Sequence, residues 1–519
     1  MAFENLTMKN YLEQEAELLK LILESEGIAG SVATIPPRGT ISKSPLSYAQ
    51  ERLWFLNRLE PNGDAYNVPL AFELTGELNR HVLERSLQEI IRRHEVLRTR
   101  FVMEAGRPVQ EILETPQVHL PFMDLRSFDA DEARKRAKQI ATEEGRRSFD
   151  LSKGELLHAV LMRLEDERHW LAFTIHHIVF DEWSLKIFKE ELRAIYDAFR
   201  AGKPSPLPGL PIQYADFAVW QRKWLKGEVL EKQLEYWKKQ LSPLPEQLEL
   251  PTDHPRPLAQ SYRGAVTSRV LDWELWDRCR AISRSENASM FILLLAVFEA
   301  VIARYTGQKD FAVGCPVANR DRVETEELIG FFLNTLVMRA NLSKESTFKQ
   351  LLEQVRESAL KGFAHQDVPF EKVVEVSAPD RDLSRSPMFQ VMFTLQDSQL
   401  PKPQTGSLGL RLMPVEITTS KCDLILMVAV EEQGPTLRLN YSTDLFEEKT
   451  IQRMGEHWKR MLEAMVEEGG MEAKVWEVEM LSEEERRQVV EEWNQTEREY
   501  EREKSLGELF EAEVERRGG

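Results

Sequence analysis

The sequence predicts an α/β protein whose helices and strands are layered in two lobes. Three observations support this prediction: the chain is 519 residues long, strand-like segments alternate with helical ones, and both halves show this alternation. At this length, two helix-plus-strand lobes of about 200 residues each are expected. No repeat with a period of about 20 to 50 residues is visible, so a solenoid is not predicted.

The first half contains five segments with clear periodicity. Residues 78–93 have apolar side chains at helical spacing and run into residues 96–102, which have strand character. Residues 170–177 alternate and are rich in β-forming residues, so they predict a strand, and a helix follows directly and ends at Gly202. Residues 214–240 predict a further helical segment between two proline-rich connectors.

The second half shows the same alternation. Residues 290–304 are apolar on nearly every side, which predicts a buried helix. Residues 311–317 predict a strand, and residues 348–363 predict an amphipathic helix. Near the C-terminus, Ser482 and Glu485 have the spacing of a capping box, which predicts the start of a short charged helix.

These patterns divide the chain into four parts. Residues 1–43 contain an expected helix at 8–26 and a linker, and they form either a docking or inter-domain segment or a helix packed on the main body. The two lobes are expected at residues 44–222 and 223–475. Residues 476–519 are strongly charged and are expected to be a linker.

The overall composition is that of a soluble globular protein, with 42% hydrophobic and 30% charged residues. The net charge of −18 argues against nucleic-acid binding, because phosphate repulsion would have to be overcome by a strong basic patch. No stretch approaches the ~18 apolar residues that span a bilayer, and the N-terminus lacks the features of a secretory signal. We therefore expect a cytoplasmic protein that does not contact a membrane.

The most informative feature is the segment HHIVFDEWS at residues 176–184. His176 and His177 close a predicted strand, where adjacent residues point to opposite faces, so the two histidines have different roles. His177 continues the apolar face of the strand, and a neutral imidazole with a pKa near ~6.5 suits proton transfer at physiological pH. Asp181 follows an apolar run and, once buried, needs a cationic partner.

Ordinary structural interpretations stand beside this one. The histidine pair alone is also consistent with a metal site or a core pair, but zinc needs a third ligand, and no HExxH or comparable set accompanies the pair. Trp183 is expected to pack in the core and Ser184 to be the N-cap of the next helix. The cysteines, which are far apart and odd in number, are expected to be reduced core residues; they are Cys279, Cys315 and Cys422.

The pattern HHxxxDxxS of residues 176–184 resembles the active-site signature of the condensation-domain superfamily of nonribosomal peptide synthetases. Six further segments resemble the other motifs of this family and occur in the family's order. They are SYAQERLWFL at residues 47–56, RHEVLRTRF at 93–101, YADFAVWQ at 214–221, IGFFLNTL at 329–336, HQDVPFE at 365–371 and RSPMFQVMF at 385–393. Seven collinear matches between residues 45 and 393 are not a chance result.

The resemblance implies two chloramphenicol-acetyltransferase-like lobes in a V-shaped pseudo-dimer with a central tunnel. Donor and acceptor peptidyl carrier proteins would each deliver a thioester on a phosphopantetheine arm, one from each mouth of the tunnel. The domain, as a monomer without a bound cofactor or metal, would join the two substrates through an amide bond. Residues 476–519 resemble the linker toward an adenylation domain, which is absent from this chain. Residues 380–408, rich in turn formers, are expected to cross between the lobes.

The resemblance also implies roles for individual residues. His177 is the implied catalytic residue, and it either takes the proton of the attacking amine as a general base or stabilises the developing positive charge. His176 and Asp181 are implied to be structural, with Asp181 paired to Arg320 in a bidentate geometry across the junction of the lobes. The residues implied to line the acceptor channel or the tunnel are Glu182, Trp183, Ser184, Asn334, Thr335 and Ser420.

Two of these positions have open alternatives. Glu182 stands where the family usually has glycine, and its carboxylate either affects the acceptor channel or turns outward at the helix start, where acids suit the helix dipole. Ser420 either lines the tunnel or packs in a loop.

Within the superfamily, an epimerase is disfavoured because no tryptophan follows Ser184, and a heterocyclisation domain because the histidines are retained. The opening motifs resemble the subtype that takes an L-configured donor. The alternative function is a catalytically silent scaffold that binds carrier proteins or recruits tailoring enzymes.

Overall fold

The computed structural model describes most of the chain: residues 34–39, 41–115, 118–377, 382, 384–396, 408–431, 433–497 and 504–518. The helix expected at residues 8–26 lies outside this range. The chain forms two compact units, Met1–Glu477 and Val478–Gly519. The boundary between these units lies two residues after the end of the second predicted lobe.

The first unit contains a five-stranded sheet in which β6 and β5 are parallel and the other neighbours antiparallel. Its strands, in spatial order, are β12 (Gly409–Met413), β2 (Asn67–Thr75), β7 (Arg168–His176), β6 (Leu157–Glu165) and β5 (Phe122–Asp124). Helices α3 (Arg80–Arg93) and α5 (Glu182–Arg200) cover one face, and α4 (Ala130–Gly145) covers the other.

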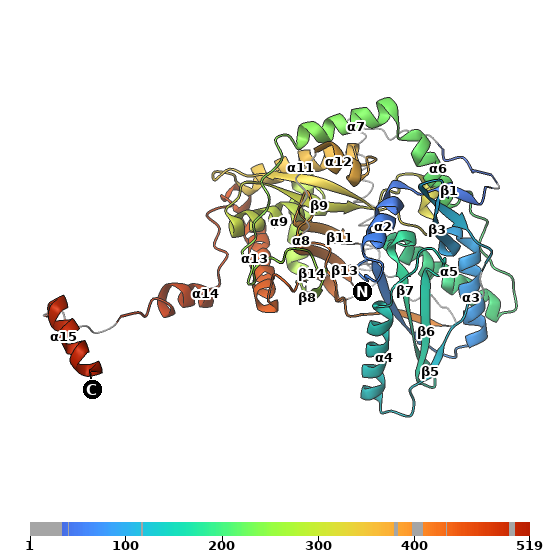
Figure 1. The fold of residues 1–519 in the computed structure, drawn as a ribbon, viewed down its shortest axis with the longest axis horizontal. Helices are drawn as coiled ribbons and strands as arrows, with labels where there is room; N and C mark the ends of the chain where they lie inside the picture. Colours follow the sequence, from blue (N-terminus) through green and yellow to red (C-terminus); the bar gives the residue numbers. More distant parts are fainter. Residues whose placement is uncertain are drawn as a thin grey trace. The chain divides into compact units, whose positions relative to one another are not determined.

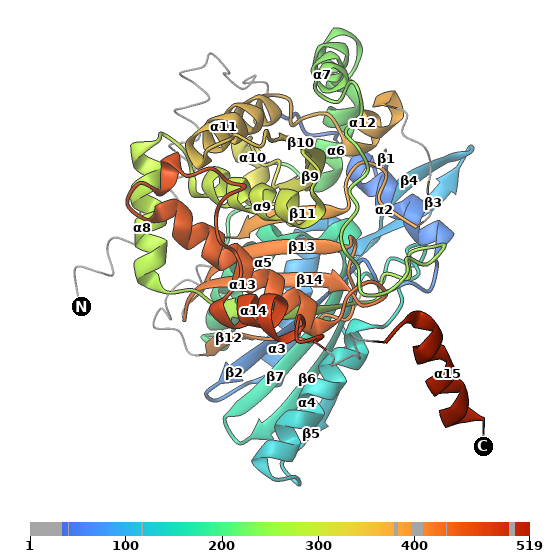
Figure 2. The same cartoon turned by 90° about the vertical axis from the view of Figure 1, so that its left-hand side faces the viewer.

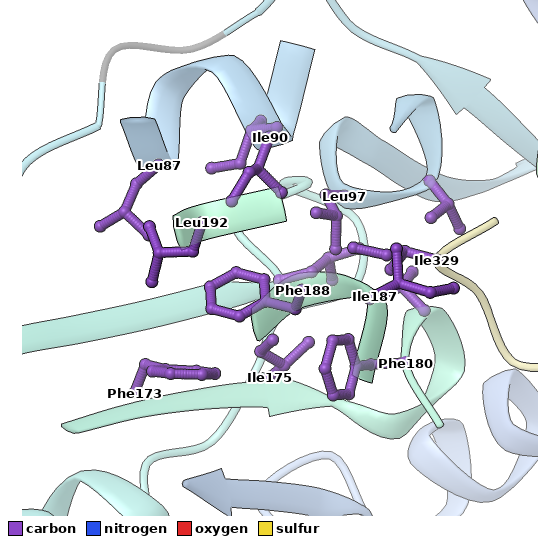
Figure 3. Packing of buried hydrophobic residues seen from close by; sticks show 14 of the residues in the cluster. Leu87, Ile90, Leu97, Phe173, Ile175, Phe180, Ile187, Phe188, Leu192 and Ile329 are labelled. Carbon is purple, nitrogen blue, oxygen red and sulfur yellow. The ribbon is translucent and has the colours of Figure 1, made fainter. Parts of the chain in front are cut away.

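Alternation along β7 explains why both faces of this sheet are covered. Phe173 and Ile175 face α3 and α5, whereas Trp170 and Ala172 pack against α4, because successive side chains of a strand point to opposite faces. Figure 3 shows Phe173 and Ile175 beneath Phe188 of helix α5, with side chains of helix α3 on the far side of α5. The predicted α/β layering is therefore present in this part of the chain.

A second, six-stranded sheet is mixed. Its strands, in spatial order, are β10 (Asn334–Asn341), β9 (Asp310–Val317), β11 (Val391–Gln396), β13 (Leu424–Glu431), β14 (Gly434–Ser442) and β8 (Gly264–Val270). One face is covered by four helices (Figures 1 and 2): α8 (Trp273–Ser285), α9 (Met290–Thr306), α11 (Phe348–Ala364) and α13 (Glu448–Val466). Helix α9 is buried on nearly all sides, as its apolar sequence predicts.

The remaining elements are a small sheet and several further helices. Strands β1 (Lys43–Pro45), β4 (Arg107–Ile112) and β3 (Thr99–Glu104) form a three-stranded antiparallel sheet. Within the described part of the first unit, the other helices are α2 (Tyr48–Leu59), η1 (Glu95–Arg98), η2 (His177–Val179), α6 (Tyr214–Trp224), α7 (Gly227–Gln240), α10 (Val323–Glu326), α12 (Phe370–Ser377) and η3 (Gly470–Glu472).

The second unit contains α14 (Glu483–Arg487), the π-helix η4 (Gln488–Glu492) and α15 (Leu506–Arg517). The capping box predicted at Ser482 and Glu485 is present: each backbone N–H donates to the other's side chain, at 2.7 and 3.0 Å.

Several expected boundaries differ from the observed ones. The single helical segment at 214–240 is two helices, separated where Gly227 adopts a φ of 53°, a left-handed conformation suited to glycine. The strand expected at 96–102 begins as the 3-10 turn η1 and is extended only from Thr99. The strand expected to end at His177 ends at His176, because the chain turns into η2.

The segment expected to cross between the lobes, residues 380–408, requires a correction. Its middle part is strand β11, which pairs in parallel with both β9 and β13 inside the six-stranded sheet. The next described strand, β12, instead pairs with β2 in the five-stranded sheet, and β13 returns to the six-stranded sheet. The chain therefore passes from the six-stranded sheet to the five-stranded sheet before β12 and returns after it, between Gln396 and Leu424.

Within the described residues, no single helix meets the length and apolarity expected of a membrane span, although the pair α8 and α9, bent by 105°, meets them jointly.

Candidate active site

The two histidines lie where β7 ends and the short η2 turn begins. The backbone N–H of His177 donates to the carbonyl of Tyr66 at 2.8 Å. The Nδ1 atom of His177 lies 2.6 Å from the carbonyl oxygen of Phe180. A carbonyl oxygen only accepts, so this contact requires the tautomer with the proton on Nδ1 and leaves Nε2 as the basic nitrogen.

His177 is half-buried, and its ring meets the ring of Phe331 edge-on, with 4.9 Å between the centroids. Burial is the main cause that lowers the pKa of His177 well below its ordinary value, and the positive charge of Lys421 acts in the same direction. The imidazole is therefore neutral at physiological pH and retains contact with solvent-accessible space.

His176 has a different environment from its neighbour. It is 3% exposed, and its Nδ1 accepts from the backbone N–H of Ile178 at 3.1 Å. Burial, assisted by Lys421, lowers the pKa of His176 to about 3. A permanently neutral ring that accepts from its own backbone holds the η2 turn, which agrees with the structural role that the resemblance implies.

Asp181 is the centre of a buried polar cluster. Its side chain and that of Arg320 are each 1% exposed, and Nη2 of Arg320 lies 2.9 and 3.1 Å from the two carboxylate oxygens. The carboxylate also accepts from the backbone N–H and hydroxyl of Ser184 and from the backbone N–H of Phe332. The expected Asp181–Arg320 ion pair is therefore formed.

The geometry of the ion pair differs from the expected bidentate one, in which two nitrogens of the guanidinium would each contact a carboxylate oxygen. Only Nη2 of Arg320 contacts the carboxylate, because Nη1 donates to the carbonyls of Thr325 and Leu328, each at 2.6 Å. The guanidinium carbon also lies 4.1 Å from the centre of the Phe332 ring. Arg320 thus fixes its own loop as well as Asp181.

The chain from Leu328 to Phe332 is held from three further directions. Ser184 Oγ accepts from the backbone N–H of Gly330 at 3.0 Å, and the hydroxyl of Tyr214 donates to the carbonyl of Phe331 at 2.5 Å. Nδ1 of His94 accepts from the backbone N–H of Ile329 at 3.3 Å. Ile329 is part of the core shown in Figure 3. These contacts place the ring of Phe331 against His177.

The sequence patterns did not assign these anchoring roles to Tyr214 and His94, although both residues belong to the matched motifs. They also did not assign a role to Lys421, whose charge acts on both histidines. The available signal was its position directly after Ser420.

Of the three residues that follow Asp181, Trp183 and Ser184 are placed differently from expectation, and Glu182 matches one of its two alternatives. Asp181, not Ser184, is the N-cap of α5, because its side chain accepts from the backbone N–H of Ser184. Trp183 is 39% exposed rather than in the core, and its Nε1 donates to the carbonyl of Glu326 at 2.9 Å. Glu182 is exposed in the first helical turn, as in the outward-facing alternative.

The other expected channel residues are in regular structure or in turns. The side chain of Asn334 makes contacts to the backbone of residues 366–370: Nδ2 donates to Gln366 and Val368 at 2.7 Å, and Oδ1 accepts from Phe370 at 3.1 Å. Thr335 is half-buried in strand β10. Asn334 therefore holds the loop before α12.

Ser420 is buried, and its Oγ donates to the carbonyl of Cys422 at 2.8 Å. It lines a small hollow together with Arg256, Tyr262 and Cys422, and His177 is not among the lining residues of that hollow. This arrangement favours loop packing for Ser420, with one side open to the hollow.

The three cysteines are buried and free, as expected. In the part of the chain that the structure describes, no three His, Cys, Asp or Glu side chains are grouped to hold a metal ion.

Comparisons with known proteins agree with the motif pattern. The family model of the condensation domain matches residues 41–490. A linear gramicidin synthase chain from Brevibacillus parabrevis is 45% identical over 470 residues, which cover 90% of this chain and 9% of that protein. Chondramide synthase cmdD from Chondromyces crocatus is 41% identical over 474 residues, with 90% and 12% covered. The chain thus spans about a tenth of the length of these relatives.

Solved structures show the same fold. The teicoplanin X-domain, in complex with OxyB, matches with a TM-score of 0.77 and 27% identity over 88% of this chain and 100% of that chain. The first condensation domain of the calcium-dependent antibiotic synthetase, in complex with a substrate analogue, matches with a TM-score of 0.71. Its identity is 21%, with 85% of this chain and 100% of that chain covered, so this likeness shows the fold alone.

Proposed function

This chain belongs to the condensation-domain family of nonribosomal peptide synthetases, and from this premise we propose that it forms amide bonds. Its substrates are a donor acyl or peptidyl thioester and an acceptor aminoacyl thioester, each on the phosphopantetheine arm of a carrier protein. The acceptor amine attacks the donor carbonyl carbon, the carbon–sulfur bond breaks, and the donor arm leaves as a thiol. The product remains attached to the acceptor arm.

The observation that carries this proposal is the state of His177. Its Nδ1 proton is held by the Phe180 carbonyl, its Nε2 is free of a proton, and the ring is half-buried. A neutral base of this kind suits a reaction in which an amine loses a proton as it forms a bond. His177 either accepts that proton or stabilises the positive charge on the attacking nitrogen.

The Asp181–Arg320 cluster supports this assignment indirectly. The cluster fixes the start of α5 and residues 328–332, which include Phe331, whose ring contacts His177. It joins residues on both sides of the proposed lobe boundary at 222/223, and we assign it the task of holding the two lobes in a V with a tunnel between them. Preorganised positioning of two tethered reactants contributes effective molarities of ~10⁵ M or more.

The proposed partners follow from this reaction. They are donor and acceptor carrier proteins and an adenylation domain of the same synthetase, and the opening motifs favour an L-configured donor. The phosphopantetheine belongs to the carriers, so the domain needs no cofactor of its own. Three buried, reduced cysteines suit the reducing cytoplasm, where we place the protein.

A reaction between two loaded carrier proteins tests the proposal. Wild-type protein is expected to form the dipeptidyl thioester, detected by mass spectrometry. His177→Ala is expected to lower the single-turnover rate by about 10²–10⁴-fold without abolishing it, because positioning remains. His81→Ala, at an exposed position of α3, serves as the control. Wild-type rates in His177→Ala would show that the role assigned to His177 is wrong.

The alternative of a silent scaffold has one specific observation in its favour, the likeness to the teicoplanin X-domain in complex with OxyB. The same reaction separates the two functions. A scaffold would bind loaded carrier proteins without forming a dipeptidyl thioester in wild type or in any variant.

A further inference from the structure

Lys421 comes from the other sheet and contacts Tyr66, whose backbone is hydrogen-bonded to His177. It lies in the turn before β13 of the six-stranded sheet, and its Nζ is 5.0 Å from the centre of the Tyr66 ring. The carbonyl of Tyr66 accepts from the backbone N–H of His177. Tyr66 thus contacts the lysine through its ring and the histidine through its backbone.

The turn that carries Lys421 is firmly held. The backbone N–H of Ser420 donates to the carbonyl of Tyr262 at 2.8 Å, and Asp423 forms an ion pair with Arg256. A Cβ added at Gly264 would lie 2.5 Å from the backbone nitrogen of Ser420, so the segments that carry these two residues are in close contact. The position of the Lys421 backbone is therefore set by contacts on both sides.

The charge of Lys421 is not offset by a nearby acid. Among the described residues, no carboxylate lies within 4.0 Å of its Nζ. Glu371 of α12 pairs instead with Arg52 of α2, at 3.3 Å. The groups that act on the charge of Lys421 are Arg52, which repels it, and the thiol of Cys422, whose pKa burial raises to about 12.

We propose that Lys421 is a positioning residue whose positive charge, held against the Tyr66 ring next to His177, favours the uncharged forms of the imidazole and of the incoming acceptor amine. The inference deepens the proposed function and rests on it. The same charge favours the oxyanion that forms when the amine attacks the thioester carbonyl, because opposite charges attract most strongly where water is scarce. Lys421 itself exchanges no proton in this scheme.

The sign of the effect follows from electrostatics. A neighbouring cation disfavours the protonated form of any base, and Lys421 lowers the pKa of both His176 and His177. An acceptor α-amine, with an ordinary pKa of about 8, experiences the same field at this site. Burial, followed by Arg52, lowers the pKa of Lys421 itself to about 8, so most of the lysine remains charged at neutral pH.

The pH dependence of the single-turnover rate tests the inference. Lys421→Met is expected to move the acid limb of the rate profile to higher pH. Its single-turnover rate should be about 3- to 10-fold below that of wild type near pH 6 and equal to it above about pH 9. Lys421→Arg retains the charge and is expected to keep the limb in place. Lys459→Met, a half-buried lysine on α13 that pairs with Glu463, is the matched control. A loss of equal size at every pH would overturn the inference, since that result indicates packing alone.

A second measurement does not depend on turnover. Histidine-selective ¹⁵N labelling follows the titration of His177 in the free protein, and its midpoint is expected to lie at higher pH in Lys421→Met than in wild type and in Lys459→Met. Circular dichroism verifies folding, and Lys421→Gln replaces the methionine variant if the latter does not fold. An unchanged midpoint overturns the inference even if dipeptide forms. A raised midpoint without dipeptide in wild type supports the electrostatic coupling and rejects the proposed function.

Discussion

The carboxylate of Asp181 does two tasks that would otherwise need two residues. It caps helix α5 by accepting from Ser184, and it neutralises Arg320, which is 139 residues further along the chain. Both side chains are almost completely buried, so neither charge has water as an alternative partner. The cluster is therefore sensitive to the loss of either member.

Asp181→Ala is expected to destabilise the protein by about 3–5 kcal/mol, because it leaves the Arg320 guanidinium buried without a counter-charge. Denaturant unfolding monitored by circular dichroism measures the change. Asp166→Ala, which removes an exposed partner of Arg126, is the matched control and is expected to have little effect. Equal losses in the two variants would contradict the assignment of a buried structural pair.

Glu299 is a buried acidic residue in the most apolar helix, α9. It is 2% exposed on α9, and burial raises the pKa of its carboxyl to about 8. The folded protein therefore binds this proton more tightly than the unfolded chain, whose carboxyl titrates near about 4.3. Stability linked to Glu299 is present below about pH 4 and is lost progressively as the pH rises toward about 8.

Glu299→Gln is expected to remove this pH dependence. The variant should be more stable than wild type above about pH 8, by several kcal/mol at about 1.4 kcal/mol per pKa unit, and similar to wild type near about pH 4. Urea unfolding at a series of pH values checks the prediction. Glu353→Gln, on an exposed position of α11, makes the same chemical substitution without altering a buried site. A difference between Glu299→Gln and wild type that is constant with pH would refute it.

At the scale of elements, the chain from Leu328 to Phe332 positions the site although it has no regular structure. It is fastened by Ser184, Tyr214 and His94, which come from three different helical segments or their flanks. Gly330 has no room for a side chain, since a Cβ there would lie 2.1 Å from the Tyr214 ring. A residue of any other type would push this segment away from its anchors.

Gly330→Ala is expected to destabilise the protein by about 1–3 kcal/mol and to lower the rate of dipeptide formation, because Phe331 moves relative to His177. Thermal and denaturant unfolding, together with the carrier-protein reaction, measure the two effects. Gly209→Ala is the control, since nothing lies within 4 Å of the added Cβ. If both variants behaved alike, close packing at Gly330 would not be the cause.

At the scale of the first unit, β12 ties the two large sheets together. It completes the edge of the five-stranded sheet, with Leu410 opposite Leu74 and Leu412 opposite Phe72, although its flanking strands lie in the six-stranded sheet. The first lobe as predicted from the sequence, residues 44–222, therefore lacks one of its own strands. An uncovered edge of this kind is prone to pair with other chains.

A fragment of residues 41–260 is expected to self-associate, because the edge of β2 is unpaired. The same fragment with residues 408–423 appended through a flexible linker is expected to remain monomeric and to unfold at a higher urea concentration. Size-exclusion chromatography and urea unfolding of the two fragments compare them directly. Monomeric behaviour of the shorter fragment with equal stability would show that β12 is not needed to complete the sheet.

Sequence patterns were sufficient to identify the family, the α/β class, the buried helix α9 and the histidine motif at residues 176–184. Periodicity and motif spacing are local properties, so they can be read without knowing which segments meet. The folded structure was needed to show that Asp181 rather than Ser184 caps α5, that Trp183 is exposed and that β12 crosses to the other sheet. It also decided which nitrogen of His177 carries the proton and that Lys421 acts on it. The reason is physical: each of these features depends on contacts between residues brought together by folding, whose energies no local pattern encodes.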